Sequence, residues 1–546
     1  MKTSCLALVL ALALAGAGAA PAAPMPLIDG LGSHTFPVTT KSPEAQKYFD
    51  QGLRLLFGFN HGASIRSFEE AVRLDPTCAM AYWGVALANG PHINFPMVPP
   101  PNAEAAWQAM QQAQKYADTA TPLERDFITA LAARYANPQP DDRSPLDRAY
   151  AEAMRQVWQA HPDSADAGVL FAEAMMDLRP WDQWTPEGQA QPGTDEILAT
   201  LDAVLKLEIN HPFANHLYIH AVEASPHPER ALPAADRLRD LQPGIAHNVH
   251  MPSHVYIRCG RWFDAVTANQ KAVDASQQIR ARRGPPQGFI VFYNAHDRHM
   301  LAYAAMMTGQ SALALEHINA MVAELPEDVL KEYAMFADAF VAMPFEVMLR
   351  FGRWDEVLAA AEPAEHLPFA RAFRHAARGV AFAAKGDVKA AQAEQEAFVA
   401  GAKLVPPEDM MGNNPAQAIT EVARHMLAGE ILYRAGQVDE GVAELREAVK
   451  LEDALRYDEP PPWILPTRHV LGAQLMQARR FAEAEQVYRD DLKRLSNDAW
   501  ALFGLAESLR FQHRLNEAKD VDGQFKAMWA KADLTVHSSC LCQPGL

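Results

Sequence analysis

Histidines are concentrated in one part of this 546-residue chain. Nine of its 20 histidines lie between residues 211 and 299. Three of them, His247, His250 and His254, fall within eight residues, and Arg258 follows one turn later. Spacings of three and four place these side chains on one face of a helix. Imidazoles that share a face can share a metal ion, so the search for chemistry starts here.

A second stretch has the same register when both are aligned on a turn glycine. The three histidines precede Gly260 by 13, 10 and 6 residues. The residues at the same separations before Gly309 are His296, His299 and Tyr303. We therefore expect two neighbouring helices to present histidine at matching heights.

The preceding helix fits the same pattern when a proline sets the register. His216 and Glu223 lie 4 and 11 residues after Pro212, with His220 between them. His247 and His254 have the same separations from Pro243. Three successive helices are thus predicted to place histidine on one surface.

This surface is predicted to bind a transition metal. Histidine pairs four residues apart occur twice, as His216 with His220 and His250 with His254, and a neighbouring helix could complete each ligand shell. The predicted ligands are His216, His220, His247, His250, His254, His296 and His299. Histidine with carboxylate suits copper, zinc or iron, and the sequence does not choose among these metals.

Three further residues are predicted to have catalytic roles. Glu223 lies among the histidines as a ligand, a partner of a ligand or a general base. Residues 343–354 repeat the pattern of residues 251–262, with Glu346 in place of a histidine and Arg350 in place of Arg258. We therefore predict that Glu346 and Arg258 are catalytic residues, together with Glu223. The predicted activity is that of a metal-dependent oxidoreductase or hydrolase.

Two other interpretations remain open. Arg258, Arg350 and Arg434 could clamp a carboxylate or phosphate, so the surface could bind a peptide or an anionic small molecule without catalysis. The histidines could also be ordinary packing or surface residues. Pro252 and Pro344 matter to every interpretation, because a proline either bends a helix or begins one.

The elements that must position these residues are helical repeats. Residues 67–76 read as the end of a helix pair and residues 79–84 as the opening of the next, and residues 260–265, 352–357 and 497–506 repeat these patterns. A period of about 34 residues is typical of such pairs. The chain resembles the tetratricopeptide repeat family over most of residues 43–532, in about nine or ten helix pairs. The resemblance implies an all-α, right-handed superhelical solenoid whose first helices line a concave groove.

The predicted organisation has five parts. They are a signal peptide (1–22), a linker (23–42), amino-terminal and central repeats (43–330), carboxy-terminal repeats (331–534) and a flexible tail (535–546) that contains Cys540 and Cys542. Proline-rich or tryptophan-bearing insertions are expected near 90–102 and 179–193, as surface loops or as flaps over the groove.

Composition limits the location and the partners. The formal net charge is −18, and an acidic chain without a basic stripe argues against a nucleic-acid partner. Lys2 followed by the short apolar run of residues 6–15 predicts a cleaved export signal and a periplasmic or secreted protein. No stretch reads as a membrane span. The expected partner is a small molecule or peptide held in the groove.

Overall fold

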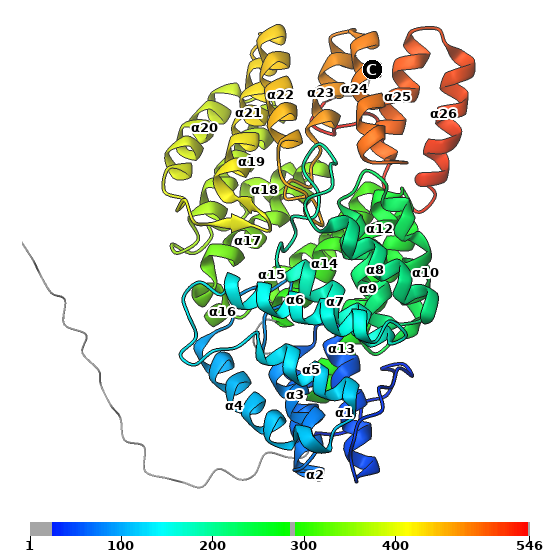
Figure 1. Ribbon diagram of the computed structural model, residues 1–546. Helices are drawn as coiled ribbons and strands as arrows, with labels where there is room; N and C mark the ends of the chain where they lie inside the picture. Colours follow the sequence, from blue (N-terminus) through cyan, green and yellow to red (C-terminus); the bar gives the residue numbers. More distant parts are fainter. Residues whose placement is uncertain (1–24, 284–289, 544–546) are drawn as a thin grey trace, which may run out of the picture.

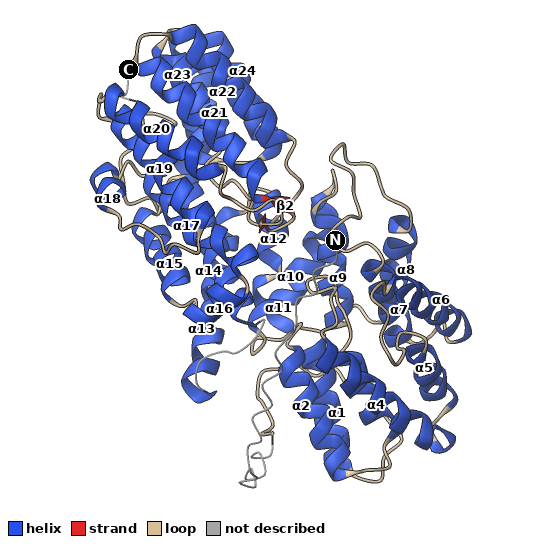
Figure 2. Ribbon diagram, turned by 90° about the vertical axis from the view of Figure 1, so that its left-hand side faces the viewer, coloured by secondary structure: helices blue, strands red, loops and turns tan. Residues whose placement is uncertain are grey.

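The computed structural model describes residues 25–283 and 290–543, and most of these residues are helical, with almost no strand (Figures 1 and 2). The predicted signal peptide lies outside them. The predicted all-α solenoid of tetratricopeptide-like helix pairs is confirmed, because consecutive helices pack side by side along the described chain. None of these helices is both long and apolar enough to cross a membrane.

The amino-terminal helices extend from the bottom of Figure 1, where α1 to α5 lie, to its middle, where α6 to α8 lie. They are α1 (Pro43–Leu56), α2 (His61–Leu74), α3 (Ala79–Ala88), α4 (Pro100–Tyr116), α5 (Pro122–Ala132), α6 (Ser144–Ala160), α7 (Ala165–Asp177) and α8 (Thr194–Leu207), with a 3-10 turn, η1 (Ala117–Thr119). Capping residues mark the start of several of these helices. Thr121 and Glu124 form a capping box at the start of α5, which satisfies backbone N–H groups that the helix leaves free.

The central helices carry the histidine-rich region. They are α9 (Pro212–Glu223), α10 (Leu232–Leu241), α11 (Ala246–His250), α12 (Pro252–Arg258), α13 (Trp262–Arg283), α14 (Ile290–Met307), α15 (Ser311–Ala323) and α16 (Glu327–Glu332), with a 3-10 turn, η2 (Pro228–Ala231). The glycines used to set the register end their helices as expected. Gly260 and Gly309 have φ of 70° and 71°, a conformation that glycine adopts without steric cost.

The carboxy-terminal pairs form the upper part of Figure 1. They are α17 (Ala334–Arg350), α18 (Trp354–Ala359), α19 (Pro368–Ala384), α20 (Val388–Ala402), α21 (Ala416–Arg434), α22 (Val438–Asp453), α23 (Thr467–Gln477), α24 (Phe481–Arg494), α25 (Ala499–Phe511) and α26 (Leu515–Met528). A two-stranded antiparallel hairpin, β1 (Met410–Met411) and β2 (Asn414–Pro415), precedes α21.

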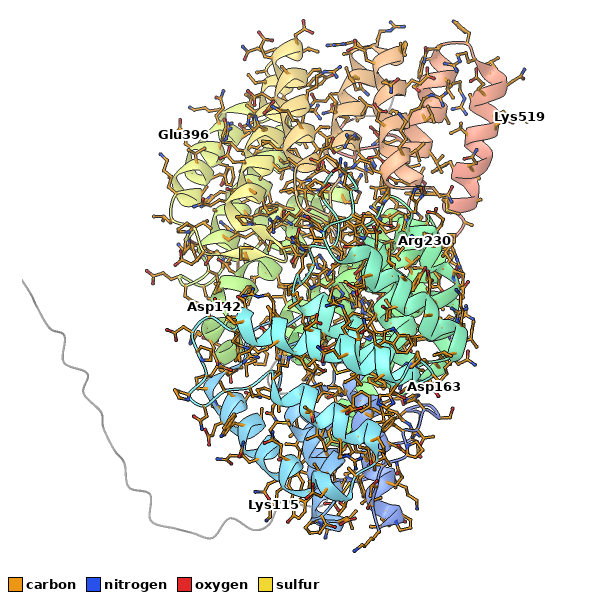
Figure 3. The ribbon with its side chains drawn as sticks, in the orientation of Figure 1. Lys115, Asp142, Asp163, Arg230, Glu396 and Lys519 are labelled. Carbon is orange, nitrogen blue, oxygen red and sulfur yellow. A yellow bond between two sulfur atoms is a disulfide. The ribbon has the colours of Figure 1, made fainter. Side chains whose placement is uncertain are left out.

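Charged residues at the outer edges of the array are exposed. Figure 3 labels Lys115, Asp142, Asp163, Arg230, Glu396 and Lys519. Inside, one continuous apolar core runs from the first helix pair to the last.

The last repeats pack back onto the turns of the central ones. The indole N–H of Trp262 donates to the Ser496 carbonyl (2.9 Å), and the indole N–H of Trp500 donates to the Met306 carbonyl (3.0 Å). The backbone N–H of Asp533 reaches the carbonyl of Gly309 (3.1 Å). The array therefore closes on itself over residues 260–309.

Three predicted boundaries differ from the structure. The segment from residue 25 to residue 42 is not a free linker: Thr39 bonds Glu124 through both its N–H and its hydroxyl (2.6 Å each), and buried His34 contacts Asp166. The insertion predicted at 90–102 stops being a loop at Pro100, because proline is readily accepted in the first turn of a helix and α4 begins there.

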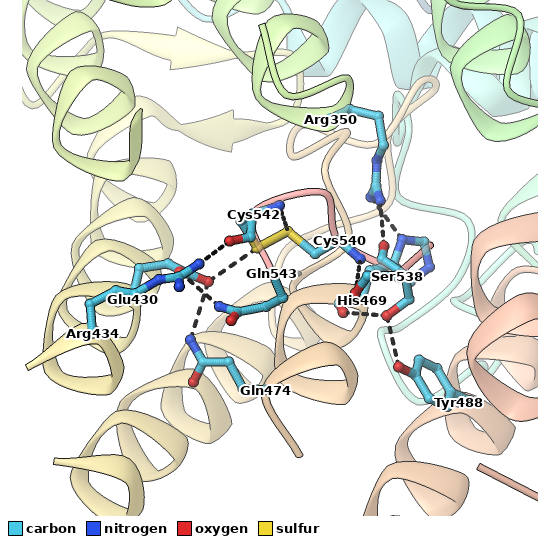
Figure 4. The surroundings of a disulfide bond; sticks show 11 residues. Arg350, Glu430, Arg434, His469, Gln474, Tyr488, Ser538, Cys540, Cys542 and Gln543 are labelled. Atoms are coloured by element: carbon cyan, nitrogen blue, oxygen red, sulfur yellow. Dashed lines mark hydrogen bonds between the residues drawn. A yellow bond between two sulfur atoms is a disulfide. The ribbon is translucent and has the colours of Figure 1, made fainter. Parts of the chain in front are cut away.

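The predicted flexible tail is also packed. Cys540 and Cys542 form a disulfide and are buried (Figure 4). Ser539 accepts a hydrogen bond from Arg350 at its carbonyl (3.0 Å) and donates its hydroxyl to the His469 carbonyl (2.8 Å). Sequence alone predicted flexibility because the tail is short and polar, but its polar groups find partners inside the carboxy-terminal repeats.

Candidate metal centre

The first helices of three successive pairs point their histidines toward one another. α9 presents His216, His220 and Glu223, whose spacing of four and three residues keeps them on one face. α11 and α12 contribute His247, His250 and His254, and α14 contributes His296.

The helix continues through Pro252 and keeps the histidines on the shared face. α11 ends at His250 and α12 begins at Pro252. Between them Met251 keeps helical torsion angles, φ −46° and ψ −40°. The helix therefore continues through the proline, as Pro344 also allows inside α17. His250 and His254 consequently stay one turn apart on the same side.

The first histidine set comprises His216, His220 and His247. The Nε2 atoms of His216 and His247 are 3.2 Å apart, and the rings of His216 and His220 are 5.0 Å apart. One nitrogen from each of the three lies within 4.8 Å of the others. A single ion can therefore be reached by all three side chains after small movements.

The second histidine set comprises His250, His254 and His296. Nε2 of His254 lies 2.7 Å from Nε2 of His250 and 3.4 Å from Nε2 of His296. One ligand nitrogen from each again lies within 4.8 Å of the others. The two sets are adjacent, since the rings of His220 and His254 are 5.8 Å apart.

Glu223 connects the two sets. Its Oε1 accepts from Nδ1 of His220 (2.8 Å), and its Oε2 accepts from Nδ1 of His254 (2.5 Å). The carboxylate is fully buried. Burial alone would raise its pKa, but its interactions with His254 and His220 outweigh burial and lower the pKa to about 2. Glu223 is therefore a carboxylate that orients one ligand of each set.

Two other histidines are oriented in the same way. Nδ1 of His216 donates to the carbonyl oxygen of Phe57 (2.7 Å), and Nδ1 of His250 donates to Oδ1 of Asn269 (2.5 Å). The amide of Asn269 is itself fixed, because its nitrogen donates to the carbonyl of Ala265 (2.9 Å). These acceptors assign the proton to Nδ1, so the lone pair is on Nε2.

The consequence is that lone pairs face one another in a buried space. His216, His220, His250 and His254 each hold a proton on Nδ1 and turn Nε2 inward, and all four are at most 4% exposed. Burial and the neighbouring imidazoles keep the pKa of His216 and His250 well below the usual value, which disfavours a bridging proton. Inward lone pairs with outward N–H groups are the arrangement that a bound cation requires.

Aromatic side chains enclose the centre. The ring of Phe59 lies 4.5 Å from that of His216 and 5.4 Å from that of His247. Trp181, on the insertion predicted near 179–193, meets the ring of His220 edge-on at 5.2 Å. Tyr457, from the loop before α23, brings its hydroxyl to 3.5 Å from Glu223. The insertion therefore packs against His220.

Three predicted site residues lie outside both histidine sets. His299 turns away from the sets, and its ring faces Phe340 at 5.8 Å. Glu346 accepts the backbone N–H groups of Ile464 (2.8 Å) and Leu465 (3.0 Å) instead of facing a histidine.

Arg258, the third, donates to the carbonyl of Ser225 (3.1 Å) and lies over the ring of Tyr457. It belongs to the layer around Glu223 and contacts none of the histidines.

Two similar-looking groups elsewhere are ion pairs. His34 and His211 both approach Asp166, at 3.0 and 3.4 Å. His469 contacts Asp498 at 2.5 Å on one side, while the Arg350 guanidinium donates to its Nδ1 (2.7 Å) on the other. The guanidinium of Arg350 beside His469 opposes the binding of a metal cation there, so His469 is a structural residue held between Arg350 and Asp498.

Fold and site together define a helical-repeat protein with a buried centre of six histidines. No family model matches the chain, and no curated protein matches it. Among solved structures it is similar to the human IFIT1 dimer with m7Gppp-AAAA, at 13% identity and a TM-score of 0.32, over 90% of this chain and 92% of that chain.

It is also similar to a chain of the APC/C hetero-tetramer Cut9-Hcn1, at 12% identity and a TM-score of 0.29, over 90% of this chain and 76% of that chain. Likenesses this distant have no bearing on what the histidine centre does.

Proposed function

We propose that this chain is an exported metal-binding repeat protein whose two histidine sets each hold one transition-metal ion. The supporting observation is the shared orientation of the imidazoles. Three of them, His216, His250 and His254, have Nδ1 committed to a protein acceptor and Nε2 directed at another imidazole, as close as 2.7 Å. Two lone pairs at that distance repel each other unless a cation lies between them or close by.

The ligand chemistry narrows the choice of metal. Imidazole nitrogens suit zinc, copper and iron, but iron sites in oxygenases generally add a carboxylate ligand. Of the nearby carboxylates, Glu223 is already used by two imidazole N–H groups, and Asp297 lies 3.4 Å from Nδ1 of His250 rather than at its Nε2. Three neutral nitrogen ligands per ion therefore favour copper or zinc over iron.

Three protein ligands also leave a coordination position for water or a substrate. Catalytic zinc sites keep such an open position, whereas structural sites fill all four with protein. The ring of Phe59 and the insertion that carries Trp181 shield the histidines from bulk water. This favours a metal-dependent oxidoreductase or hydrolase over a scaffold that only binds a peptide.

Metal content measured on purified protein tests the proposal. Apoprotein is loaded separately with copper(I), zinc(II) and iron(II), desalted and analysed by mass spectrometry. We expect about two equivalents of copper or zinc per chain, and about one in His220→Ala and in His250→Ala, which each disable one set. His299→Ala is the matched control, a buried histidine of the same region outside both sets, and it should keep both equivalents.

Failure of all three metals to bind stoichiometrically would overturn the proposal. Two equivalents that persist in His220→Ala and His250→Ala would also overturn it, because the ions would then lie elsewhere. Unchanged helical circular dichroism in each variant shows that lost metal is not lost fold.

A further inference from the structure

Residues 538–543, which we call the terminal segment, run into the interior of the carboxy-terminal repeats. Ser539 and Gln543 are each 1% exposed, and the two cysteines between them are at most 5% exposed. Just before the terminal segment, Thr535 and His537 are exposed. The end of a chain is normally poorly ordered unless specific contacts hold it. The contacts that hold this one are therefore informative.

Two arginines hold the backbone of the terminal segment. Arg350 donates to the carbonyl of Ser539 (3.0 Å). Arg434 donates to the carbonyl of Cys542, on the other side of the disulfide (Figure 4). Each arginine is the last residue of the first helix of a pair, α17 or α21. Contacts to carbonyl groups recognise an extended backbone, whatever its side chains are.

Two side chains of the terminal segment are recognised as well. The hydroxyl of Ser539 donates to the carbonyl of His469 (2.8 Å) and accepts from the hydroxyl of Tyr488 (2.7 Å). The amide of Gln543 donates to Oε2 of Glu430 (3.2 Å), a buried carboxylate. The site therefore selects a hydroxyl side chain and, four residues later, an amide.

These contacts resemble those of a bound peptide more than those of a core element. If the terminal segment left, Arg350, Arg434 and Glu430 would each lose a hydrogen-bond partner. A polar group that loses its partner in a buried place is costly, so another donor or acceptor must replace it. The chain's own end thus fills a site that a second peptide with the same groups could fill.

The disulfide fixes the part of the segment that lies between the two arginine contacts. Cys540 and Cys542 close a ring of three residues, and the N–H of Cys542 also lies 3.2 Å from Sγ of Cys540. A closed ring has fewer conformations to lose when the segment docks, which favours docking about tenfold for a ring of this size. Two separate thiols also need more room than a bonded pair, in a closely packed site.

Undocking of the terminal segment would leave the rest of the chain in place. Asp533 accepts the backbone N–H groups of Ser311 and Ala312 (2.8 Å each) at the start of α15. This attachment is independent of the disulfide. The exposed residues Thr535 and His537 lie between it and the buried segment, so they can serve as the hinge.

We propose that the terminal segment occupies a peptide-binding site of its own chain, and that reduction of Cys540–Cys542 by a dithiol releases it. The S–S bond breaks, each sulfur gains one electron and one proton, and the dithiol becomes a disulfide. The released site then binds an extended peptide that carries a hydroxyl side chain followed four residues later by an amide. The metal centre has no part in this proposal.

The probe is a fluorescein-labelled peptide of residues 535–543 that carries Cys540→Ser and Cys542→Ser, so that a reductant cannot act on it. Its binding to the metal-free full chain is measured by fluorescence anisotropy with and without dithiothreitol. The terminal segment competes with the probe, so the apparent affinity of the probe should rise about tenfold on reduction. Cys78 and Cys259 are free thiols, so Cys540–Cys542 is the disulfide that reduction breaks among the described residues.

Variants of the full chain separate the disulfide from the other contacts. The double variant Cys540→Ser, Cys542→Ser should bind the probe as the reduced native chain does, with or without dithiothreitol. Gln543→Ala weakens the chain's own segment alone, so the probe should bind about fivefold more tightly while the disulfide is intact. Thr535→Ala, in the exposed part, is the control and should change nothing. Unchanged helical circular dichroism shows that each variant folds.

Two further measurements complete the test. A probe that also carries Ser539→Ala and Gln543→Ala should bind at least about tenfold more weakly. In native protein without probe, the amides of residues 538–543 should exchange hydrogen about tenfold faster after reduction, while those of α26 stay unchanged.

Two results would overturn the proposal. Equal probe affinity and equal hydrogen exchange with and without dithiothreitol would show that the disulfide does not hold the segment. A probe that fails to bind the double cysteine variant, or that binds equally well without its serine and glutamine side chains, would show that the site does not take a second peptide.

Discussion

Replacing Glu223 by glutamine should separate the two histidine sets. The native carboxylate accepts two hydrogen bonds, one from His220 in the first set and one from His254 in the second. A glutamine has one oxygen that can accept a hydrogen bond and one NH₂ group that can only donate. Whichever histidine meets the NH₂ group must move its proton from Nδ1 to Nε2, and a protonated Nε2 cannot bind a metal.

The size of the effect follows from what one such partner contributes. Loss of a partner that orients a metal ligand typically costs 10–100-fold in metal affinity, or about 1.4–2.7 kcal/mol. In Glu223→Gln we expect one of the two affinities to fall by this amount and the other by less than about threefold. In Glu223→Ala, where neither histidine keeps its acceptor, both affinities should fall by about 10–100-fold.

The assay is competition with a chromogenic chelator, fitted to two binding sites, with zinc and then with copper(I). Glu346→Gln is the matched control, because Glu346 is an equally buried glutamate on the first helix of a later pair. It accepts two backbone N–H groups at one oxygen, which a glutamine oxygen can also do. Its metal affinities should be unchanged.

Two results would refute the reasoning about Glu223. If Glu223→Gln keeps both affinities within about twofold of native, the carboxylate does not orient the ligands. If both sites weaken equally in Glu223→Gln, the proton assignment on His220 and His254 is wrong, because a single amide should spare one of them.

Two further predictions concern stability. Burial lowers the pKa of His34, but hydrogen bonds and charges from Asp166 and Glu208 outweigh it and raise the pKa to about 9. Protonated His34 therefore stabilises the fold by at most about 3 kcal/mol below about pH 6.5, and this stabilisation is lost as the pH rises through about 9. In urea titrations, the difference in unfolding free energy between the native protein and His34→Gln should shrink over that pH range. A difference that stays constant would contradict the assignment. Gly260→Ala should lower the free energy of unfolding by more than the roughly 1–2 kcal/mol that an alanine in the left-handed conformation costs, since its Cβ would lie 2.6 Å from the Ser496 carbonyl. Gly386→Ala is the control for the backbone cost alone, because Gly386 has φ of 84° and a Cβ there would meet nothing within 4 Å. Equal losses of stability in the two variants would show that the contact with Ser496 is unimportant.

The convergence of the histidines was predictable because it depends on periodic features. Helical spacing fixes which side chains share a face, and turn glycines such as Gly260 and Gly309 fix the relative heights of neighbouring helices. Six of the seven predicted histidines meet as a result. His299 was misplaced because α14 also packs against α17, and that side of the helix takes His299 toward Phe340.

The residues that orient the histidines could not be predicted in the same way. The acceptor for His216 is a backbone carbonyl, that of Phe57, and a carbonyl has no side-chain signature. Asn269 lies on the second helix of its pair, where nothing in its spacing distinguishes it from other polar residues. Glu346 was predicted from a repeated sequence pattern. In the structure, the loop of residues 464–465 packs against it, and two backbone N–H groups of this loop bond its carboxylate.

The closure of the array bears on how the histidine centre could open. In an open array of repeats each helix pair contacts only its neighbours, so the array can extend, and its inner surface widens as the ends separate. Here Trp262, at the start of α13, is hydrogen-bonded to Ser496, and Gly309 is hydrogen-bonded to Asp533, in both cases more than two hundred residues away in sequence. Separating α13 and α14 from the last repeats would break these ties, so the ties hold these two helices in place. We infer that an ion exchanges through local movement of the covering segments around Trp181 and Tyr457.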